Sequence, residues 1–142
     1  MRYAERGIMK ARSIWICGYR SVVDNCRGHS VVVDLPPENN GEDTGATALE
    51  LAVMGLAGCV TTIFKMVAEK RKLEYSDLVV EIDAEKGAKT IEKCKGTMTI
   101  WTKADKSEVE KTLKLTLEIC PVGLLFEKAG IKTEWEIKIE SP

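Results

Sequence analysis

The stretch TALELAVMGLAGCVTTIFKMVAEKRK, residues 47–72, decides the fold of this chain. From Leu51 to Phe64 it has no charged residue, and its side chains are apolar, small or hydroxyl-bearing on every face. A helix that is apolar all round is normally buried. The uncharged run is shorter than the ~20 apolar residues that a membrane-spanning helix requires. We therefore predict the core helix of a soluble protein and no membrane span.

Local signals mark both ends of this helix. Thr47, followed three residues later by Glu50, fits a capping box in which each side chain satisfies a backbone N–H at the helix start. The charged residues 69–72 return the chain to water. Near the middle, Cys59 places a thiol inside the most apolar element of the chain, and this placement needs an explanation.

Length and charge limit the class of protein. A chain of 142 residues without an internal repeat is most simply one domain, residues 1–142. Its 21 basic and 22 acidic residues nearly balance, and the densest basic run, residues 70–72, suits a solvated helix end. Nucleic acid and anionic membrane surfaces are therefore not expected as partners.

The cysteines indicate a reducing compartment. There are five of them, without a CxxC motif, and the chain has one histidine. This pattern fits neither a secreted disulfide framework nor a zinc site. The first ten residues, MRYAERGIMK, are not followed by the apolar segment of a secretory signal. We expect a cytoplasmic protein with free thiols.

Strands flank the core helix on both sides. Alternation and β-branched residues predict strands at 9–19, 21–23 and 31–35, followed by a turn-rich loop over 36–45. After the helix, residues 78–83 and 91–102 predict a hairpin that turns at 85–88. The alternating segment 133–140 predicts a last strand.

A second helix is predicted between the hairpin and the last strand. Asp105 and Glu108 fit another capping box at its start. We expect a break at Cys120, because proline disfavours the helical conformation in the residue before it. A new helix then begins at Pro121 and continues to about Lys128.

This order of elements favours an α+β fold with antiparallel sheets over a doubly wound fold, because most strands are linked as hairpins and no GxGxxG motif is present. One chain of this size leaves part of so apolar a helix uncovered. A homodimer with the two helices at its centre would cover it.

Two of the thiols differ from inert, buried cysteines, the usual state that we assign to Cys17 and Cys94. Cys120 lies at the start of a helix, where unpaired N–H groups and the helix dipole favour a thiolate. Cys59 lies in apolar surroundings, which raise the pKa of a thiol. No cation lies within one helical turn of Cys59, so an activating charge must come from elsewhere in the fold.

Together these segments resemble a known family. The run GHSVVVDLPPENNGEDTGATALELAVMGLAGCV, residues 28–60, followed about sixty residues later by the CPV of residues 120–122, is similar to the OsmC/Ohr family of thiol-dependent hydroperoxide reductases. The similarity covers nearly the whole chain. It implies the OsmC-like fold, in which antiparallel sheets wrap a long central apolar helix in an intertwined homodimer.

The resemblance also implies a chemistry for the two thiols. Cys59 would attack the peroxide, and Cys120 would resolve the sulfenic acid to an intramolecular disulfide. A dithiol reductant such as dihydrolipoamide would then restore the thiols. The implied substrate is a small or fatty-acyl organic hydroperoxide, and no metal or organic cofactor is implied.

The family has a catalytic arginine in a Gly-Gly-Arg-like setting near the N-terminus. The segment Gly18-Tyr19-Arg20 matches this setting best, so the resemblance implies that Arg20 lowers the pKa of the Cys59 thiol. Arg27 is the alternative candidate. A plain surface position for Arg20 at the end of a strand is the competing interpretation.

The chain departs from the family at the catalytic glutamate. The best-known branch has Pro-Glu-x-Leu, whereas residues 48–51 read ALEL and are closer to the Pro-x-Glu-Leu of a less characterised OsmC-like branch. Glu50 is the matching residue and would orient Arg20, although the shift by one residue turns a helix by ~100°. Its capping role competes with this assignment. His29, which also resembles that branch, is given no catalytic role.

Three functions follow from these observations. The first is a hydroperoxide reductase that turns over. The second is a redox-sensing or small-molecule-binding protein on the same fold, which the loss of the Pro-Glu pattern favours. The third is a structural dimer in which both cysteines only pack. Turnover under excess dithiol distinguishes the first from the second, because a sensor is oxidised once and an enzyme cycles.

Overall fold

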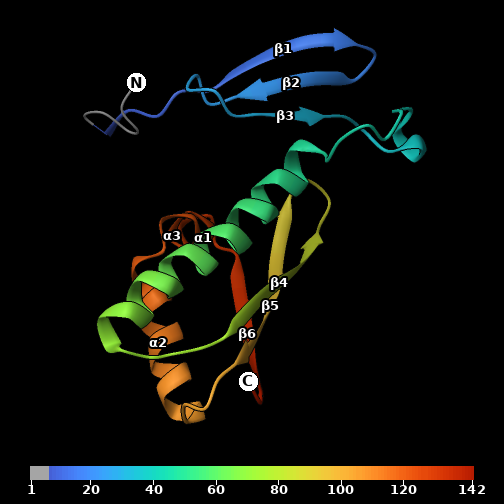
Figure 1. Cartoon of the computed structure of the whole chain (residues 1–142). Helices are drawn as coiled ribbons and strands as arrows, with labels where there is room; N and C mark the ends of the chain where they lie inside the picture. Colours follow the sequence, from blue (N-terminus) through green and yellow to red (C-terminus); the bar gives the residue numbers. More distant parts are fainter. Residues whose placement is uncertain (1–6) are drawn as a thin grey trace. The chain divides into compact units, whose positions relative to one another are not determined.

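The structure, a computed structural model, describes residues 7–142 (Figure 1). The chain divides into two compact units, one ending at Ala52 and one starting at Val53, and each is described by itself. A single domain over 1–142 stays a prediction. Residues 1–6, on which the expected lack of a secretory signal partly rests, lie outside the described residues.

The first unit, residues 7–52 as described, contains a three-stranded antiparallel sheet in the order β1-β2-β3. Its strands, β1 (Arg12–Cys17), β2 (Arg20–Asp24) and β3 (Ser30–Val33), match the three predicted ones with shifted ends. The predicted loop over 36–45 contains a short 3-10 turn, η2 (Pro37–Asn39).

Helix α1 (Ala48–Arg71) begins as predicted. The Thr47 N–H donates to Glu50 Oε1 at 2.9 Å, and the Glu50 N–H donates to Thr47 Oγ1 at 3.0 Å. This confirms the first capping box. The helix then buries one face in the second unit, through residues four apart such as Leu56, Val60 and Phe64.

The opposite face of α1 is exposed in the single chain, as predicted for a chain too small to cover so apolar a helix. Met54 is 56% exposed and Met66 is 48% exposed. By length and composition alone, the 24 residues of α1 are apolar enough to cross a membrane. Core helices of soluble proteins pass the same test.

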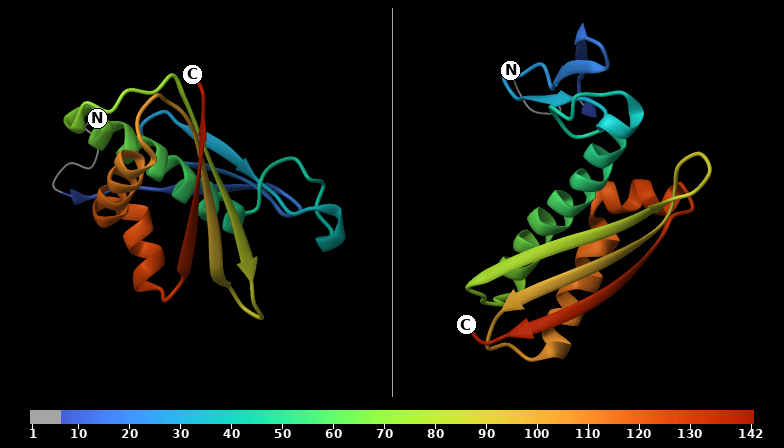
Figure 2. Two further views of the ribbon diagram at one scale, coloured as in Figure 1. Left: turned by 90° about the horizontal axis from the view of Figure 1, so that it is seen from below. Right: turned by 90° about the vertical axis from the view of Figure 1, so that its right-hand side faces the viewer.

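The second unit, residues 53–142, packs three helices on one face of a three-stranded sheet (Figure 2). The sheet has the order β4-β5-β6, with β4 (Asp77–Lys86), β5 (Ile91–Trp101) and β6 (Lys132–Glu140). The helices are α1, α2 (Lys106–Ile119) and α3 (Pro121–Lys128). Their apolar faces and the covered face of the sheet form the core.

The mixed α+β class is as predicted, with one difference in the second sheet. Strands β4 and β5 pair antiparallel, but β5 and β6 pair parallel. The expectation of antiparallel sheets fails for this pair because α2 and α3 form a crossover that carries the chain back to the end of the sheet where β5 began.

The break between α2 and α3 occurs where it was predicted. Helix α2 ends at Ile119, Cys120 has an extended backbone, and Pro121 opens α3. The second capping box is not formed: Asp105 makes no side-chain cap bond, and the Glu108 carboxylate instead accepts a bond from Arg71 at 2.9 Å. A long-range ion pair therefore replaces the local cap.

Candidate functional site

Cys59 and Cys120 lie side by side in the second unit. Cys59 belongs to α1 and is partly exposed, whereas Cys120 sits between α2 and α3 and is fully buried. Their sulfurs are 2.9 Å apart, although the residues are 61 positions apart in sequence. Both are free thiols. Because a disulfide bond is ~2.05 Å long, the two sulfurs need to approach by less than about 1 Å to form one.

The hydrogen bonds give the two sulfurs different roles. The Cys120 thiol donates to the Cys59 sulfur, and the Cys120 sulfur accepts from the Gly123 N–H at 3.4 Å. Cys120 is thus the N-cap of α3. The Cys59 sulfur is the acceptor in this bond.

Burial, and after it the hydrogen bond to Cys59, raise the pKa of the Cys120 thiol to about 11, against a smaller lowering by the Gly123 N–H. The prediction that the helix start favours a Cys120 thiolate is therefore wrong in direction. The physical reason is that burial removes the sulfur from water, and the N–H groups at the start of α3 lower the pKa by less than burial raises it. At neutral pH Cys120 keeps the proton that it shares with Cys59.

A cavity of about 550 Å³ lies in the second unit, and neither Cys59 nor Cys120 is among its lining residues. Its lining includes Leu56, Gly123, Ile131 and Trp135. Gly123 separates it from the buried sulfur, because a Cβ added there would lie 3.4 Å from Cys120 Sγ. Cavities of ~300–1,000 Å³ with mostly apolar walls are typical of small-molecule sites. This one has room for an apolar chain.

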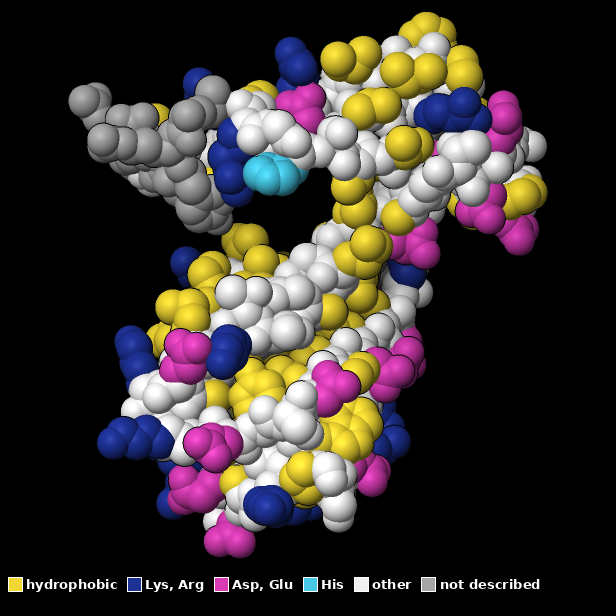
Figure 3. Space-filling view, viewed as in Figure 1, with side chains coloured by type: hydrophobic (Ala, Val, Ile, Leu, Met, Phe, Trp, Pro, Cys, Tyr) yellow, Lys and Arg dark blue, Asp and Glu magenta, His cyan; other side chains and the backbone are white. Residues whose placement is uncertain are grey.

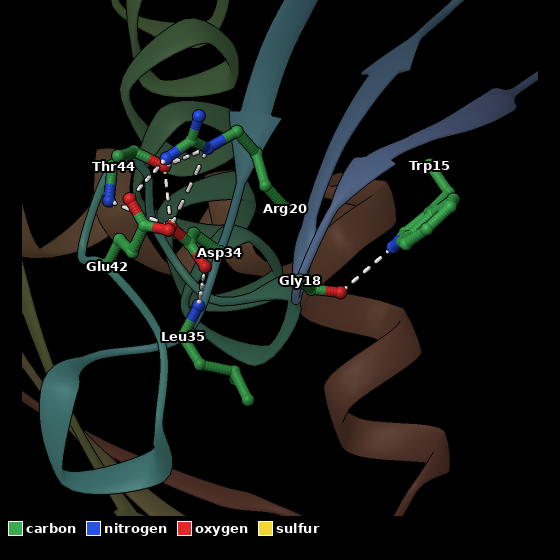
Figure 4. Close-up of polar contacts among 7 residues, drawn as sticks. All are labelled: Trp15, Gly18, Arg20, Asp34, Leu35, Glu42 and Thr44. Carbon is green, nitrogen blue, oxygen red and sulfur yellow. Dashed lines mark hydrogen bonds and ion pairs between the residues drawn. The ribbon is translucent and has the colours of Figure 1, made fainter.

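Arg20 lies in the first unit and belongs to a polar cluster, shown in Figure 4. Its Nε donates to Thr44 Oγ1 at 2.9 Å, and its Nη2 is 3.1 Å from Glu42 Oε2. The carboxylate of Asp34 lies 4.0 Å from Nε. Arg20 is thus held by side chains of its own unit, and its catalytic role stays a prediction.

Glu50 and Arg27 have other surroundings. The Glu50 carboxylate accepts from the Thr47 N–H, and no bond from Arg20 to Glu50 is present among the described residues. The structure therefore shows the capping role for Glu50, and its catalytic role stays a prediction. Arg27 lies in the turn before β3, where its N–H donates to the Asn25 side chain. His29 contacts the same asparagine and serves this turn.

Asp34 and Thr44 are the residues that sequence reasoning missed. Asp34 is 2% exposed, and its pKa is lowered to about 2, chiefly by the Thr44 hydroxyl bond. A lone acid at the end of a β-branched strand, followed by two prolines, was the available signal. Among residues 7–142 no group of side chains suited to a metal ion is present.

Comparisons with known proteins agree on the fold. The family model described as OsmC-like protein matches residues 41–136, which is more than half of the chain. Comparison with curated proteins gives no significant match. Solved structures with low identity to this chain share its fold over nearly the whole length.

Three of these structures show the range. An OsmC-like protein from Mycoplasma pneumoniae has a TM-score of 0.85 at 10% identity, covering 95% of this chain and 99% of its own. An organic hydroperoxide resistance protein OsmC from Legionella pneumophila has a TM-score of 0.74 at 17% identity, covering 92% and 96%. The organic hydroperoxide resistance protein OhrB of Bacillus subtilis has a TM-score of 0.65 at 16% identity, covering 94% and 100%. With its α+β architecture and the match to more than half of its length, this chain belongs to the OsmC family.

Proposed function

We propose that this protein is a cysteine-based peroxidase that reduces organic hydroperoxides with electrons from a dithiol. The observation that carries the proposal is the 2.9 Å separation of the Cys59 and Cys120 sulfurs, with Cys120 as the donor. Two thiols at this distance can pass between the reduced and disulfide forms with little rearrangement. The family and its neighbours named as organic hydroperoxide resistance proteins support the same conclusion.

The proposed reaction has three steps. The Cys59 thiolate attacks one peroxide oxygen, the O–O bond breaks, and the alkoxide leaves as alcohol after taking a proton from water. Cys59 is then a sulfenic acid. Cys120 attacks its sulfur, the disulfide forms, and the hydroxyl group leaves as water with the Cys120 proton. A dithiol reduces this disulfide by two exchanges and becomes a disulfide itself.

Arg20 supplies the positive charge in this proposal, and Glu50 orients it or only caps α1. Arg20 carries a fixed guanidinium, held by Thr44 and Glu42. An adjacent cation lowers the pKa of a thiol and increases the thiolate fraction. The family resemblance, and no measured contact, assigns this charge to Cys59.

The proposed substrate is an alkyl or fatty-acyl hydroperoxide. The cavity that Gly123 separates from the Cys120 sulfur is lined in part by Leu56, Ile131 and Trp135, which suit an apolar chain better than hydrogen peroxide. Its lining also includes the charged residues Glu127, Lys132 and Glu134. A lipoyl-type dithiol is the proposed reductant. The proposed location is the cytoplasm, where thiols are kept reduced.

A homodimer is part of the proposal. The exposed face of α1 carries Met54 and Met66, and Figure 3 shows hydrophobic side chains at the surface of both units. Gly55 and Gly58 lie on this face, and a Cβ added at either meets nothing within 4 Å. Glycine inside a helix costs about 1 kcal/mol relative to alanine, so the chain itself gives no reason for them. A second copy that approaches closely gives one.

The test is a thiol count on the reduced protein after a slight excess of cumene hydroperoxide, with disulfides mapped by mass spectrometry. We expect rapid formation of a Cys59–Cys120 bridge, absent in Cys59→Ser and Cys120→Ser and reset by a dithiol. Cys17, which we expected to be buried, is exposed in the first unit. Cys17→Ser is the matched control and should behave as wild type. Thiols that stay reduced for minutes would contradict the proposal.

The second candidate is a redox sensor on the same fold. The observations that favour it are the loss of the Pro-Glu pattern and the use of Glu50 Oε1 in the helix cap. Peroxide consumption under excess dihydrolipoamide separates the two functions. An enzyme consumes many equivalents, whereas a sensor consumes one equivalent per thiol pair.

A further inference from the structure

Arg20 is held along one edge of its guanidinium by the loop between β3 and α1 (Figure 4). Its Nε bonds Thr44 and its Nη2 bonds Glu42. A guanidinium has five N–H donors. Among the described residues these bonds use two of them, and both hydrogens of Nη1 remain for a ligand. The Arg20 side chain is therefore anchored while some of its N–H donors stay available.

The bond from Arg20 to Thr44 belongs to a series of two hydrogen bonds in which Arg20 donates to Thr44 and Thr44 donates to Asp34. The Thr44 hydroxyl has a single proton, which it donates to Asp34 Oδ2 at 2.6 Å. Its lone pairs are then turned toward the Arg20 Nε–H. Each bond in such a chain strengthens the next, because donation by a hydroxyl makes its oxygen a better acceptor. Asp34 thus acts on Arg20 through Thr44.

Asp34 itself is fixed by the backbone. It is 2% exposed and accepts from the Leu35 N–H at 2.8 Å and the Thr44 N–H at 3.1 Å. These bonds keep the buried carboxylate ionised and in one orientation. The positions of Asp34 and Thr44 are therefore fixed by hydrogen bonds to the local main chain.

Two glycines pack the loop tightly on the end of β3. A Cβ on Gly41 would collide with the carbonyl oxygen of Leu35, and one on Gly45 would collide with that of Val32. The Asp43 N–H also donates to the Leu35 carbonyl at 3.0 Å. The loop is thus a compact scaffold that returns Thr44 to Asp34.

Glu42 differs from this inner pair. Its side chain is 75% exposed, so water and salt screen its ion pair with Arg20. It can leave the guanidinium at small cost. The anchor of Arg20 is therefore the buried Asp34 and Thr44, with Glu42 as an outer partner.

We propose that Asp34, through Thr44, is the positioning residue for Arg20, in the role that the family resemblance suggests for Glu50. Glu42 is dispensable for this role. The inference rests on the part of the proposed function that assigns Arg20 to the Cys59 thiol, and it is independent of whether the protein consumes peroxide.

The experiment measures how fast iodoacetamide alkylates Cys59 in the full-length reduced protein, read from the Cys59 peptide by mass spectrometry across pH about 5 to 10. Arg20→Ala gives the reference loss. We expect Thr44→Val to lower the rate at neutral pH about tenfold, as a rise of one unit in the apparent pKa of Cys59 would. Thr44→Ser, which keeps the hydroxyl, should be alkylated at Cys59 at the wild-type rate. Glu42→Gln should stay within about twofold of wild type.

Asp34→Asn tests the Asp34 end of the hydrogen-bond series, and thermal unfolding checks that the variant is folded. If Asp34→Asn does not fold, the Thr44→Val and Thr44→Ser pair still decides. A wild-type alkylation rate in Thr44→Val, with a loss in Arg20→Ala, overturns the inference and leaves the proposed function standing. A wild-type rate in Arg20→Ala overturns it as well. Slow alkylation in Thr44→Val with no peroxide turnover by the wild type supports the inference while the peroxidase proposal fails.

Discussion

Cys120 keeps its proton at neutral pH because its sulfur is buried and donates to Cys59. Its pKa of about 11 separates the roles of the two thiols. A thiol that holds its proton is a poor nucleophile toward peroxide. Cys120 is therefore suited to act second, once Cys59 has become a sulfenic acid at bonding distance.

Removing Cys120 should expose Cys59 to over-oxidation. In Cys120→Ser we expect the Cys59 sulfenic acid to persist and to be oxidised further to the sulfinic acid, since no thiol lies beside it to condense. The mass of the Cys59 peptide after repeated additions of alkyl hydroperoxide measures this. Cys94→Ser, which removes a buried cysteine, is the control. Equal sulfinic acid in Cys120→Ser and wild type would contradict the resolving role.

The raised pKa of Cys120 also predicts a loss of stability at high pH. The folded protein holds the proton up to about pH 11, whereas an unfolded cysteine releases it near ~8.5. The protonated Cys120 thiol therefore makes its full contribution to the free energy of unfolding below the pKa of the unfolded state. That contribution is lost as the pH rises toward the pKa of the folded state. We expect the free energy of unfolding of the reduced protein to fall by about 3 kcal/mol more than that of Cys120→Ser across this window. Urea titrations at several pH values test it, and parallel curves would contradict it.

At the scale of elements, short-range signals were sufficient for the helices. The Thr47–Glu50 cap and the break at Cys120–Pro121 each depend on residues close in sequence, and both are present. The second cap failed because Glu108 found a partner, Arg71, 37 positions away. Local patterns cannot report such competition between near and distant partners.

The candidate site shows the same division. The resemblance selected Cys59 and Cys120, and the fold places their sulfurs together. The pKa of Cys120 could not be predicted, because the dipole of α3 is local whereas burial depends on α1 packing over the thiol. The contact of Asp34 with Thr44 was missed for a similar reason. The two residues are ten positions apart, and they meet only because the loop after β3 folds back onto the end of that strand.

Glu50 allows a test of whether α1 carries a cap or a catalytic carboxylate. Glutamine can accept the Thr47 N–H as glutamate does, so Glu50→Gln keeps the cap and removes the charge. If Glu50 only caps, Glu50→Gln should lose little activity, whereas Glu50→Ala should lower the free energy of unfolding by about 1 kcal/mol. Urea unfolding and peroxide turnover measure the two effects. A large loss of turnover in Glu50→Gln at unchanged stability would make Glu50 catalytic.

At the scale of the whole molecule, the second unit covers only one side of its long apolar helix α1. The buried face of α1 is centred on Leu56, Val60 and Phe64, and the exposed face carries Met54 and Met66. Burial of apolar area contributes about 25 cal/mol per Å², so an uncovered methionine forgoes that gain. Association of two copies through this face would recover it.

A charge placed on this face should break the dimer that we propose. Met66 is 48% exposed in the single chain, so Met66→Lys should leave the fold of the chain intact. We expect the variant to be monomeric in analytical ultracentrifugation at concentrations where the wild type is dimeric, because a desolvated ammonium at an apolar interface costs several kcal/mol. The measurement is the sedimentation coefficient over a dilution series.

Leu115→Lys is the matched control for this experiment. Leu115 is 39% exposed and lies on α2, so the variant adds the same charge to a similarly exposed apolar position on another helix. We expect it to remain dimeric. If Met66→Lys and Leu115→Lys associate equally, the exposed face of α1 is not the interface. If the wild type is itself a monomer at all concentrations, the chain leaves this face open to water, and the glycines of α1 need another explanation.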